Sequence, residues 1–201
     1  MTTQQTRAPL HPRLNTLPKD LGVALTVLLA LALGWALFRE ADGRTRTFQE
    51  PDSPFRISYP ASWNSAAPQN DELLRVENPL TDSSYKTTLM VERRDLDPAS
   101  PPPLQTQLDR RIADHATLVG YHLLSSGTAR VGGKEAAQLE YAYVVPPLSG
   151  PRRASLPVVV RAREYLVALG DRSYYITLSA PEREFDAAAA RFDQMMQTVQ
   201  L

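Results

Sequence analysis

The stretch Phe55-Arg-Ile-Ser-Tyr-Pro-Ala-Ser-Trp63 decides how the second part of this chain folds. Apolar residues at 55, 57 and 59 alternate with polar ones, so they share one face of a half-buried strand. Pro60 ends that strand because it cannot donate to a sheet ladder. We expect Trp63 to fold back past this turn and cover the strand's apolar face. The alternative is an exposed Trp63 that contacts a partner or ligand.

Downstream of this strand the pattern predicts a mixed α+β domain. A helix over 103–116 follows a Pro-rich break, with Leu104, Leu108 and Ile112 on its buried face. Asp109, Arg110, Arg111 and Asp114 are expected outside. Gly170-Asp171 is a tight-turn signal. Further strands are predicted at 85–93 (centred on Leu89–Val91), 122–131, 136–145, 158–169 and 173–179.

The last helix is marked at both its start and its buried face. Ser179-Ala-Pro-Glu182 fits a capping box, in which Ser179 would accept the N3 amide and Glu182 would reach back. Apolar residues then recur every three to four positions, which predicts packing against a sheet rather than a ligand-binding stripe. These residues are Phe185, Ala188, Ala189, Phe192, Met195, Met196 and Val199.

The order of these motifs resembles that of PsbP-like and Mog1-like domains. The match covers about residues 48–201: the opening Phe55-x-Ile-x-Tyr59-Pro60-x-x-Trp63, the Leu-Met-Val strand, Tyr174–Leu178, and a closing helix that ends at Thr198-Val199. The resemblance implies an antiparallel β-sheet sandwiched by helices, a PsbP/Mog1-like α/β/α sandwich. It also implies a non-catalytic role, since such domains serve as accessory or assembly factors of membrane complexes, notably photosystem II, and Mog1 proteins bind a small GTPase. The motif is a folding feature, so no functional residue is carried over.

The N-terminal part contains an apolar run that predicts a transmembrane helix. Leu21–Phe38 holds 18 consecutive uncharged residues, seven of them Leu. As a helix it would be about 27 Å long, close to the thickness of the bilayer hydrocarbon. Two alternatives are a cleaved signal peptide, which would leave Trp35–Phe38 exposed, and a buried soluble helix. The predicted organisation is a leader at 1–20, a transmembrane helix at 21–38, a linker at 39–47 and a globular domain at 48–201.

Membrane orientation follows weakly from the flanking charges. Three basic residues lie on each side of the apolar run, and acidic residues offset the C-terminal ones more than the N-terminal ones. We therefore expect a cytoplasmic leader and an extracytoplasmic domain in a single-pass protein of the cell membrane. The resemblance adds a comparison, because bacterial relatives are often tethered outside the cytoplasmic membrane, many through a lipidated Cys. This chain has no Cys, so as a membrane-anchored bacterial member it would use the helix instead.

Composition excludes several classes of function. The chain carries 22 basic and 22 acidic residues, and from Phe48 onward 16 basic and 19 acidic ones, which argues against a nucleic-acid partner. Without Cys there is no disulfide framework, thiolate metal site or Cys nucleophile. No metalloprotease, nucleophile-elbow or phosphate-loop motif is present. His115 and His122 are expected at a helix end or on the surface. Glu92, Asp95 and Asp97 are expected at a solvated strand end. We therefore predict no catalytic, cofactor or metal residues.

Four arginines are the only candidate contact residues. If the loop near 152 folds back beside the following strand, the four form a basic patch that could contact a partner. Otherwise Arg161 and Arg163 are the polar face of an edge strand. The preferred hypothesis is an accessory or scaffold protein, anchored through 21–38, that binds a membrane protein complex. The alternatives are a small-ligand or ion-binding module at the membrane surface and an enzyme. The four residues are Arg152, Arg153, Arg161 and Arg163.

Overall fold

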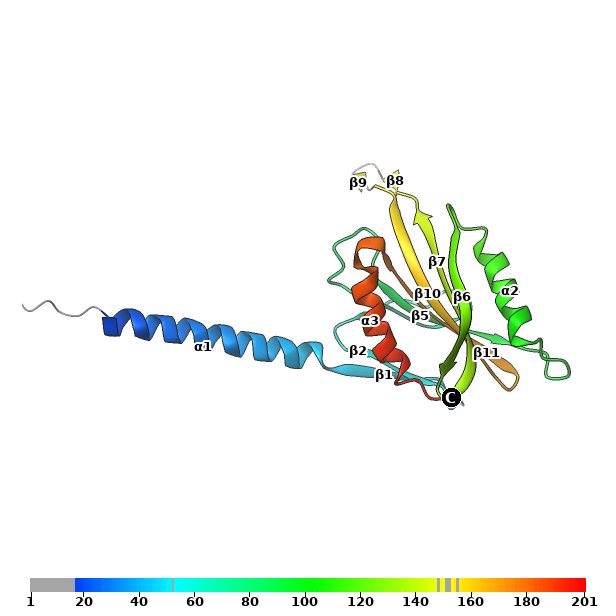
Figure 1. The fold of residues 1–201 in the computed structure, drawn as a ribbon, viewed down its shortest axis with the longest axis horizontal. Helices are drawn as coiled ribbons and strands as arrows, with labels where there is room; N and C mark the ends of the chain where they lie inside the picture. Colours follow the sequence, from blue (N-terminus) through cyan, green and yellow to red (C-terminus); the bar gives the residue numbers. More distant parts are fainter. Residues whose placement is uncertain (1–16, 52, 148, 151–152, 155) are drawn as a thin grey trace, which may run out of the picture. The chain divides into compact units, whose positions relative to one another are not determined.

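The structure is a computed structural model of the chain, and it divides into two compact units, Met1–Gly43 and Arg44–Leu201. It describes residues 17–51, 53–147, 149–150, 153–154 and 156–201 (Figure 1). Most of the predicted leader lies outside these residues, as does Arg152. Each unit is described by itself.

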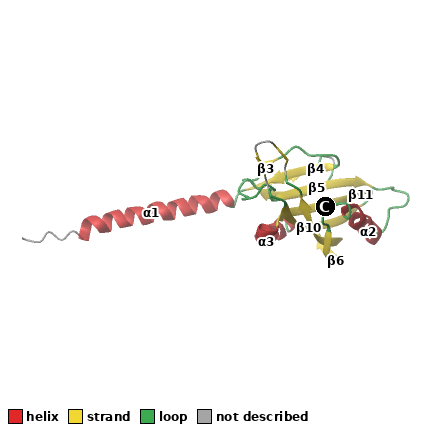
Figure 2. Ribbon diagram, turned by 90° about the horizontal axis from the view of Figure 1, so that it is seen from above, coloured by secondary structure: helices red, strands yellow, loops and turns green. Residues whose placement is uncertain are grey.

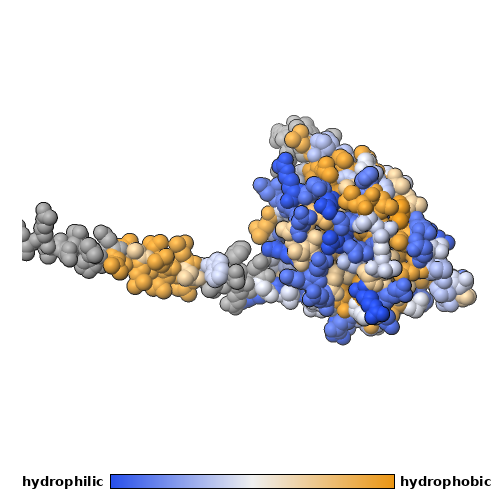
Figure 3. All heavy atoms as spheres, viewed as in Figure 1, coloured by the Kyte–Doolittle hydropathy of each residue, from blue (hydrophilic) through white to orange (hydrophobic). Residues whose placement is uncertain are grey.

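The first unit is a single helix, α1 (Leu17–Asp42). Its apolar side chains between Leu21 and Trp35 are 51–66% exposed, and Figure 3 shows apolar surface along it. Within the part of the helix whose side chains are described, the apolar stretch is too short to cross a membrane. The helix runs through 39–42, where a linker was predicted, because Arg39–Asp42 are compatible with a helix and Gly43 follows as its stop.

The second unit is built around a seven-stranded antiparallel sheet with the order β3-β4-β5-β11-β10-β7-β6 (Figures 1 and 2). Two short pairs, β1-β2 and β8-β9, lie outside it. The strands are β1 (Thr45–Gln49), β2 (Arg56–Pro60), β3 (Asn64–Ser65), β4 (Glu72–Glu77), β5 (Thr88–Asp95), β6 (His122–Val131), β7 (Lys134–Val145), β8 (Ser149–Gly150), β9 (Arg153–Ala154), β10 (Val158–Leu169) and β11 (Arg172–Pro181). The helical segments are α2 (Leu104–His115), η1 (Glu182–Glu184) and α3 (Phe185–Met196).

Helices α2 and α3 cover opposite faces of this sheet, which confirms the predicted α+β sandwich (Figure 1). The alternation along β11 shows how this arises. Tyr174 and Ile176 join one core with Phe185 of α3, while Tyr175 joins a second core with Leu108 of α2. Because successive side chains point to opposite faces, one strand supplies both cores.

The entry strand behaves as the sequence predicts. Phe55 and Ile57 are fully buried and Trp63 is 2% exposed, in the same core as Phe185 and Phe192. Phe55 stacks on Tyr174 with ring centroids 4.6 Å apart. The alternative of an exposed Trp63 is therefore wrong.

The predicted capping box at Ser179–Glu182 is wrong. Ser179 and Ala180 still belong to β11, where they pair with β10, and the Ser179 hydroxyl lies 2.7 Å from the Tyr85 hydroxyl. A turn of 3-10 helix then precedes α3, whose N-cap, Glu184, makes no side-chain capping bond. Strand pairing outweighs the local motif because it satisfies the same backbone groups over a longer stretch.

Candidate binding site

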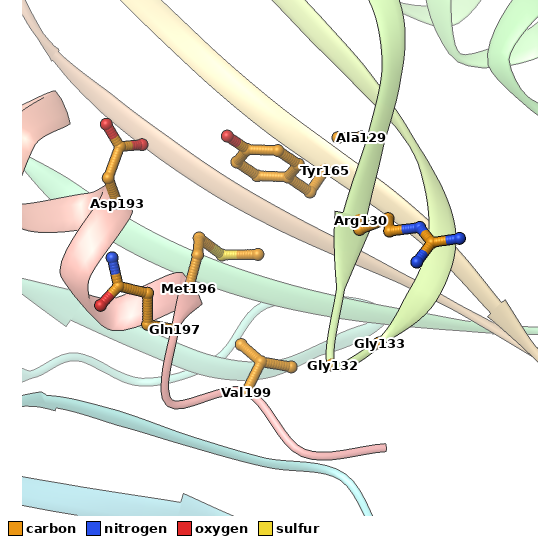
Figure 4. A pocket seen from close by; sticks show the side chains of 9 residues that line it. All are labelled: Ala129, Arg130, Gly132, Gly133, Tyr165, Asp193, Met196, Gln197 and Val199. Atoms are coloured by element: carbon orange, nitrogen blue, oxygen red, sulfur yellow. The ribbon is translucent and has the colours of Figure 1, made fainter.

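A groove of about 450 Å³ lies between the end of α3 and the β6–β7 hairpin (Figure 4). Its lining combines an apolar floor with a polar rim, and it draws on β6, the hairpin turn, β10, α3 and the C-terminal segment. The lining residues are Ala129, Arg130, Gly132, Gly133, Tyr165, Asp193, Met196, Gln197 and Val199.

The hairpin turn fixes one wall of this groove. Gly132 and Gly133 have φ values of +54° and +79°, a conformation that L side chains rarely adopt. A Cβ atom on Gly132 would lie 3.1 Å from two carbon atoms of Leu201, so the missing side chain lets the C-terminus pack against the turn. Gln200 is held from the other side by two backbone hydrogen bonds with Arg56, of 3.0 and 3.1 Å. The C-terminal segment that carries Val199 is therefore held between β2 and the hairpin.

Aromatic packing and ion pairing fix the other side. Tyr165 packs against Phe192 with ring centroids 5.7 Å apart, which places the Tyr165 ring on the floor (Figure 4). Burial raises the pKa of the Tyr165 hydroxyl, so it stays protonated near neutral pH. Asp193 accepts a 3.1 Å hydrogen bond from Arg163. The groove can thus hold an apolar side chain beneath a polar rim.

Strand β6 forms the outer side of this site and is an edge of the sheet. Its residues are exposed from His122 to Thr128, and Leu123 and Leu124 are among the exposed apolar residues of the domain. On the face that carries α3 and β6, Figure 3 shows patches of apolar surface among polar ones. The groove therefore adjoins a long, accessible strand edge.

The structure brings two of the four predicted contact arginines together and does not describe the side chains of the others. Arg161 and Arg163 both donate to Glu140, and the Arg161 guanidinium also lies 4.3 Å from the Phe185 ring centroid. They lie on β10, between β11 and β7, so the edge-strand interpretation is wrong. Arg153 belongs to β9, and Arg152 lies outside the described residues. Partner contact at the four stays a prediction.

A buried ion cluster beneath α2 was missed by the sequence reasoning. Arg111, expected outside, is 5% exposed, and Glu164 of β10 is 1% exposed. Arg111 donates to both Glu164 and Glu92, and its guanidinium lies 4.6 Å from the Tyr175 ring centroid. Two signals could have revealed the pair. Arg111 follows Leu108 by three positions, on the buried helix face, and Glu164 continues the buried alternation of β10.

The bonding of Glu164 makes this cluster structural. Its oxygens interact with Arg111, His115 and Thr177 at 2.7–3.2 Å. Burial alone would raise the pKa of the Glu164 carboxyl, but the Arg111 charge and the bonds from His115 and Arg111 lower it to about 2. The carboxylate stays ionised near neutral pH and has no accessible position at which to exchange a proton. We therefore expect the ion cluster to lose its stabilising effect only under strongly acidic conditions.

Of the other titratable residues singled out from the sequence, His115 and Glu92 adjoin the Arg111–Glu164 cluster, and His122, Asp95 and Asp97 lie apart from it. His115 ends α2 and stacks on Tyr141 with centroids 4.3 Å apart, whereas His122 is exposed on β6. Glu92 pairs with Arg111, Asp95 pairs with Arg93, and Asp97 accepts the Ala99 amide in a turn. Among the described residues, no group of three or more His, Asp or Glu is placed to hold a metal ion.

Three solved structures are similar to this chain in fold. PsbP from Synechocystis sp. PCC 6803 (CyanoP) matches with a TM-score of 0.57 and 11% identity, over 78% of this chain and 92% of that chain. LpqN of Mycobacterium tuberculosis, described as involved in cell envelope biogenesis, matches with a TM-score of 0.52 and 15% identity, over 79% and 92%. PA94 of Pseudomonas aeruginosa, a protein of unknown function described as a putative regulator, matches with a TM-score of 0.51 and 15% identity, over 78% and 96%. The predicted PsbP-like fold is confirmed.

The family follows from the sequence match rather than from these folds. No curated protein matches the sequence. Residues 47–201 match the model of the family described as the serine/threonine kinase C-terminal domain, and this range is nearly the whole second unit and most of the chain. The chain therefore belongs to the serine/threonine kinase C-terminal domain family.

Proposed function

We propose that this chain is a membrane-anchored accessory domain that binds a partner protein at the groove between α3 and the β6–β7 hairpin, without catalysing a reaction. The observation that carries the proposal is the position of this apolar-floored groove beside an exposed edge strand. Exposed apolar surface with a polar rim is typical of protein-binding sites. The family description supports a binding role, because it names a domain C-terminal to a kinase and not the kinase itself.

The polar groups of the groove support binding rather than chemistry. Asp193 is paired with Arg163, and Gln197 and Arg130 are exposed on the rim. Catalysis by a side-chain nucleophile needs an adjacent base within hydrogen-bond reach. The lining residues include no Ser, Thr, Cys, His or Lys; the one carboxylate, Asp193, is paired with Arg163, and burial keeps the Tyr165 hydroxyl protonated. The groove therefore offers an apolar contact area with a few polar groups for orientation.

The proposed anchor is the apolar run 21–38 within α1. The apolar side chains of its described part are more than half exposed, from Leu21 to Trp35, and in water this surface would be unfavourable. Burial in lipid removes it from water. Membranes washed with alkaline carbonate should retain the wild-type chain, whereas a Leu25→Arg/Leu29→Arg variant should appear in the supernatant. Release of the wild-type chain would refute the anchor and leave the groove proposal standing.

The binding site is tested with a photo-cross-linking residue placed at one of two positions in the full chain. Gln197 is exposed on the groove rim, and Arg110 is exposed on α2, which covers the opposite face. We expect a defined adduct, identified by mass spectrometry, from the 197 position and none from the 110 position. Adducts of equal yield at both positions, or only at 110, would overturn the proposal.

A small apolar ligand is the second candidate for this groove. The volume of about 450 Å³ lies within the range of small-molecule sites. Native mass spectrometry of the detergent-solubilised chain would then show a bound molecule of constant mass. Its loss in a Met196→Glu variant would assign it to the groove.

A further inference from the structure

Strand β6 is the edge strand of the sheet beside the groove. Among the described residues, no strand pairs with its outer edge. It pairs with β7 only, whereas the opposite edge is the two-residue strand β3. An edge strand presents unpaired N–H and C=O groups that can pair with another extended chain. Ten residues are enough for such pairing, because strands of five or six are common.

The usual protection of an edge strand is weak here. Natural edges carry Lys, Pro, inward-pointing charges or bulges that prevent pairing. From Leu123 to Ala129 strand β6 has no charged residue and no Pro. The register with β7 shifts only between Leu123 and Ser125, and it runs without interruption from Ser125 to Val131. The edge is therefore uncharged from Leu123 to Ala129 and regular from Ser125 onward, and Arg130 is the one charged residue near its end.

The side chains of β6 that face α3 are small. Val131 belongs to the core on the α3 side, so the period-two alternation places Ala129, Gly127 and Ser125 on the same face. Ala129 lines the groove. A Cβ atom built on Gly127 meets no heavy atom within 4 Å, so the space above this residue is open. Nothing on β6 therefore blocks a neighbouring chain from reaching the groove.

A strand added to β6 would lie about 4.8 Å from it. Long side chains of the added strand can contact diagonal neighbours in a sheet. One such side chain on the α3-facing side can cross Gly127 and enter the groove at the wall that Ala129 and the hairpin glycines form (Figure 4). The strand edge would supply the affinity of backbone hydrogen bonds, and the groove would select the side chain.

We propose that the partner enters as an extended, uncharged polypeptide segment that pairs with the outer edge of β6 and places one apolar side chain in the groove. This inference rests on the proposed function, because it names the form in which the partner meets the same groove. The absence of charge on β6 between Leu123 and Ala129 favours an uncharged segment, since a charged one would lose hydration without gaining an opposite charge.

The probe is a dye-labelled peptide, Thr-Val-Thr-Leu-Thr-Val-Thr, titrated by fluorescence anisotropy against the full chain in lipid nanodiscs. Empty nanodiscs correct for binding to lipid. Two further peptides are N-methylated. The first carries its methyl groups on the Val and Leu residues, and the second carries them on the inner Thr residues. Because alternate N–H groups of a paired strand face its neighbour, one of the methylated peptides should bind about tenfold more weakly and the other nearly as well as the parent.

Two variants of β6 form a matched pair for this titration. Gly127→Val adds a β-branched side chain on the α3-facing side, over the path to the groove, and we expect binding to weaken about tenfold. Thr128→Val is exposed on the opposite face and should leave binding unchanged. Thermal melts by circular dichroism establish that both variants are folded.

The outcomes separate this inference from the proposed function. If N-methylation has no selective effect, if both variants bind equally, or if no saturable binding occurs, the strand-pairing inference is overturned. An adduct from position 197 would in that case still support the groove as a binding site. A dimer detected by sedimentation velocity and abolished by Gly127→Val would also overturn it, since the occupant of the edge would be a second copy of this chain.

Discussion

Arg111 and Glu164 form a buried ion pair in which Nε donates to Oε1 over 2.7 Å and Nη2 donates to Oε2 over 3.1 Å. The pair joins α2 to the centre of the sheet, because Glu164 lies on β10 between its two neighbouring strands. Arg111 also binds Glu92 with two hydrogen bonds of 3.0 Å. One arginine thus holds the helix to β10 and β5.

Replacing this arginine should strongly destabilise the domain. Arg111→Met leaves Glu164 buried without its charge partner, which costs about 3–5 kcal/mol of unfolding free energy. Arg110→Met, an exposed neighbour on the same helix, should change it by less than about 0.5 kcal/mol. Urea unfolding of both variants measures the difference. Equal urea midpoints for the two variants would mean that water reaches the ion cluster and that the cluster does not stabilise the fold.

The same cluster predicts a loss of stability in acid. The folded domain lowers the pKa of the Glu164 carboxyl from 4.5 to about 2. As the pH falls, the unfolded chain therefore protonates Glu164 before the folded domain does. The stability that the ionised Glu164 contributes is fully present above about pH 4.5 and is lost as the pH falls toward 2. Glu164→Gln removes this contribution. The gap between the urea midpoints of wild type and Glu164→Gln should narrow between pH 5 and pH 2, and a constant gap would contradict the assignment.

Trp63 should contribute to stability as a core residue. It is 2% exposed and packs in the core on the α3 side, so Trp63→Ala should cost about 3–5 kcal/mol. The control is Leu80→Ala, because Leu80 is 73% exposed and its truncation should change stability by less than about 0.5 kcal/mol. Urea melts decide, and an unchanged midpoint for Trp63→Ala would refute the packing.

The two hairpin glycines allow a comparison of backbone strain with crowding. Both have positive φ, but only Gly132 has a neighbour in the way, at 3.1 Å on Leu201. Gly133→Ala should cost about 1 kcal/mol from its backbone conformation alone. Gly132→Ala should cost more, because it also displaces the C-terminus that carries Val199 in the groove. Thermal unfolding of the two variants gives the comparison, and equal losses would show that Leu201 moves aside freely.

Local patterns were enough to predict most elements of the domain. The strands at 122–131 and 158–169 have the predicted bounds, and α2 falls within the predicted 103–116. These elements follow from side-chain periodicity, which depends only on near neighbours in the sequence. The capping box at Ser179 failed because strand pairing with Ala162 extends β11 through it.

The sequence by itself determined the alternation that buries Phe55 and Ile57, the apolar stripe of α3 and the turn at Gly170. These features are local, because each follows from the spacing of side chains along a single element. Tertiary structure alone decided that β6 is an edge, that β10 is central, that Arg111 meets Glu164 across 53 positions, and that Tyr165 and Met196 form one groove. Strand order and the pairing of buried charges depend on which elements meet in space, and no pattern within a single element encodes that choice.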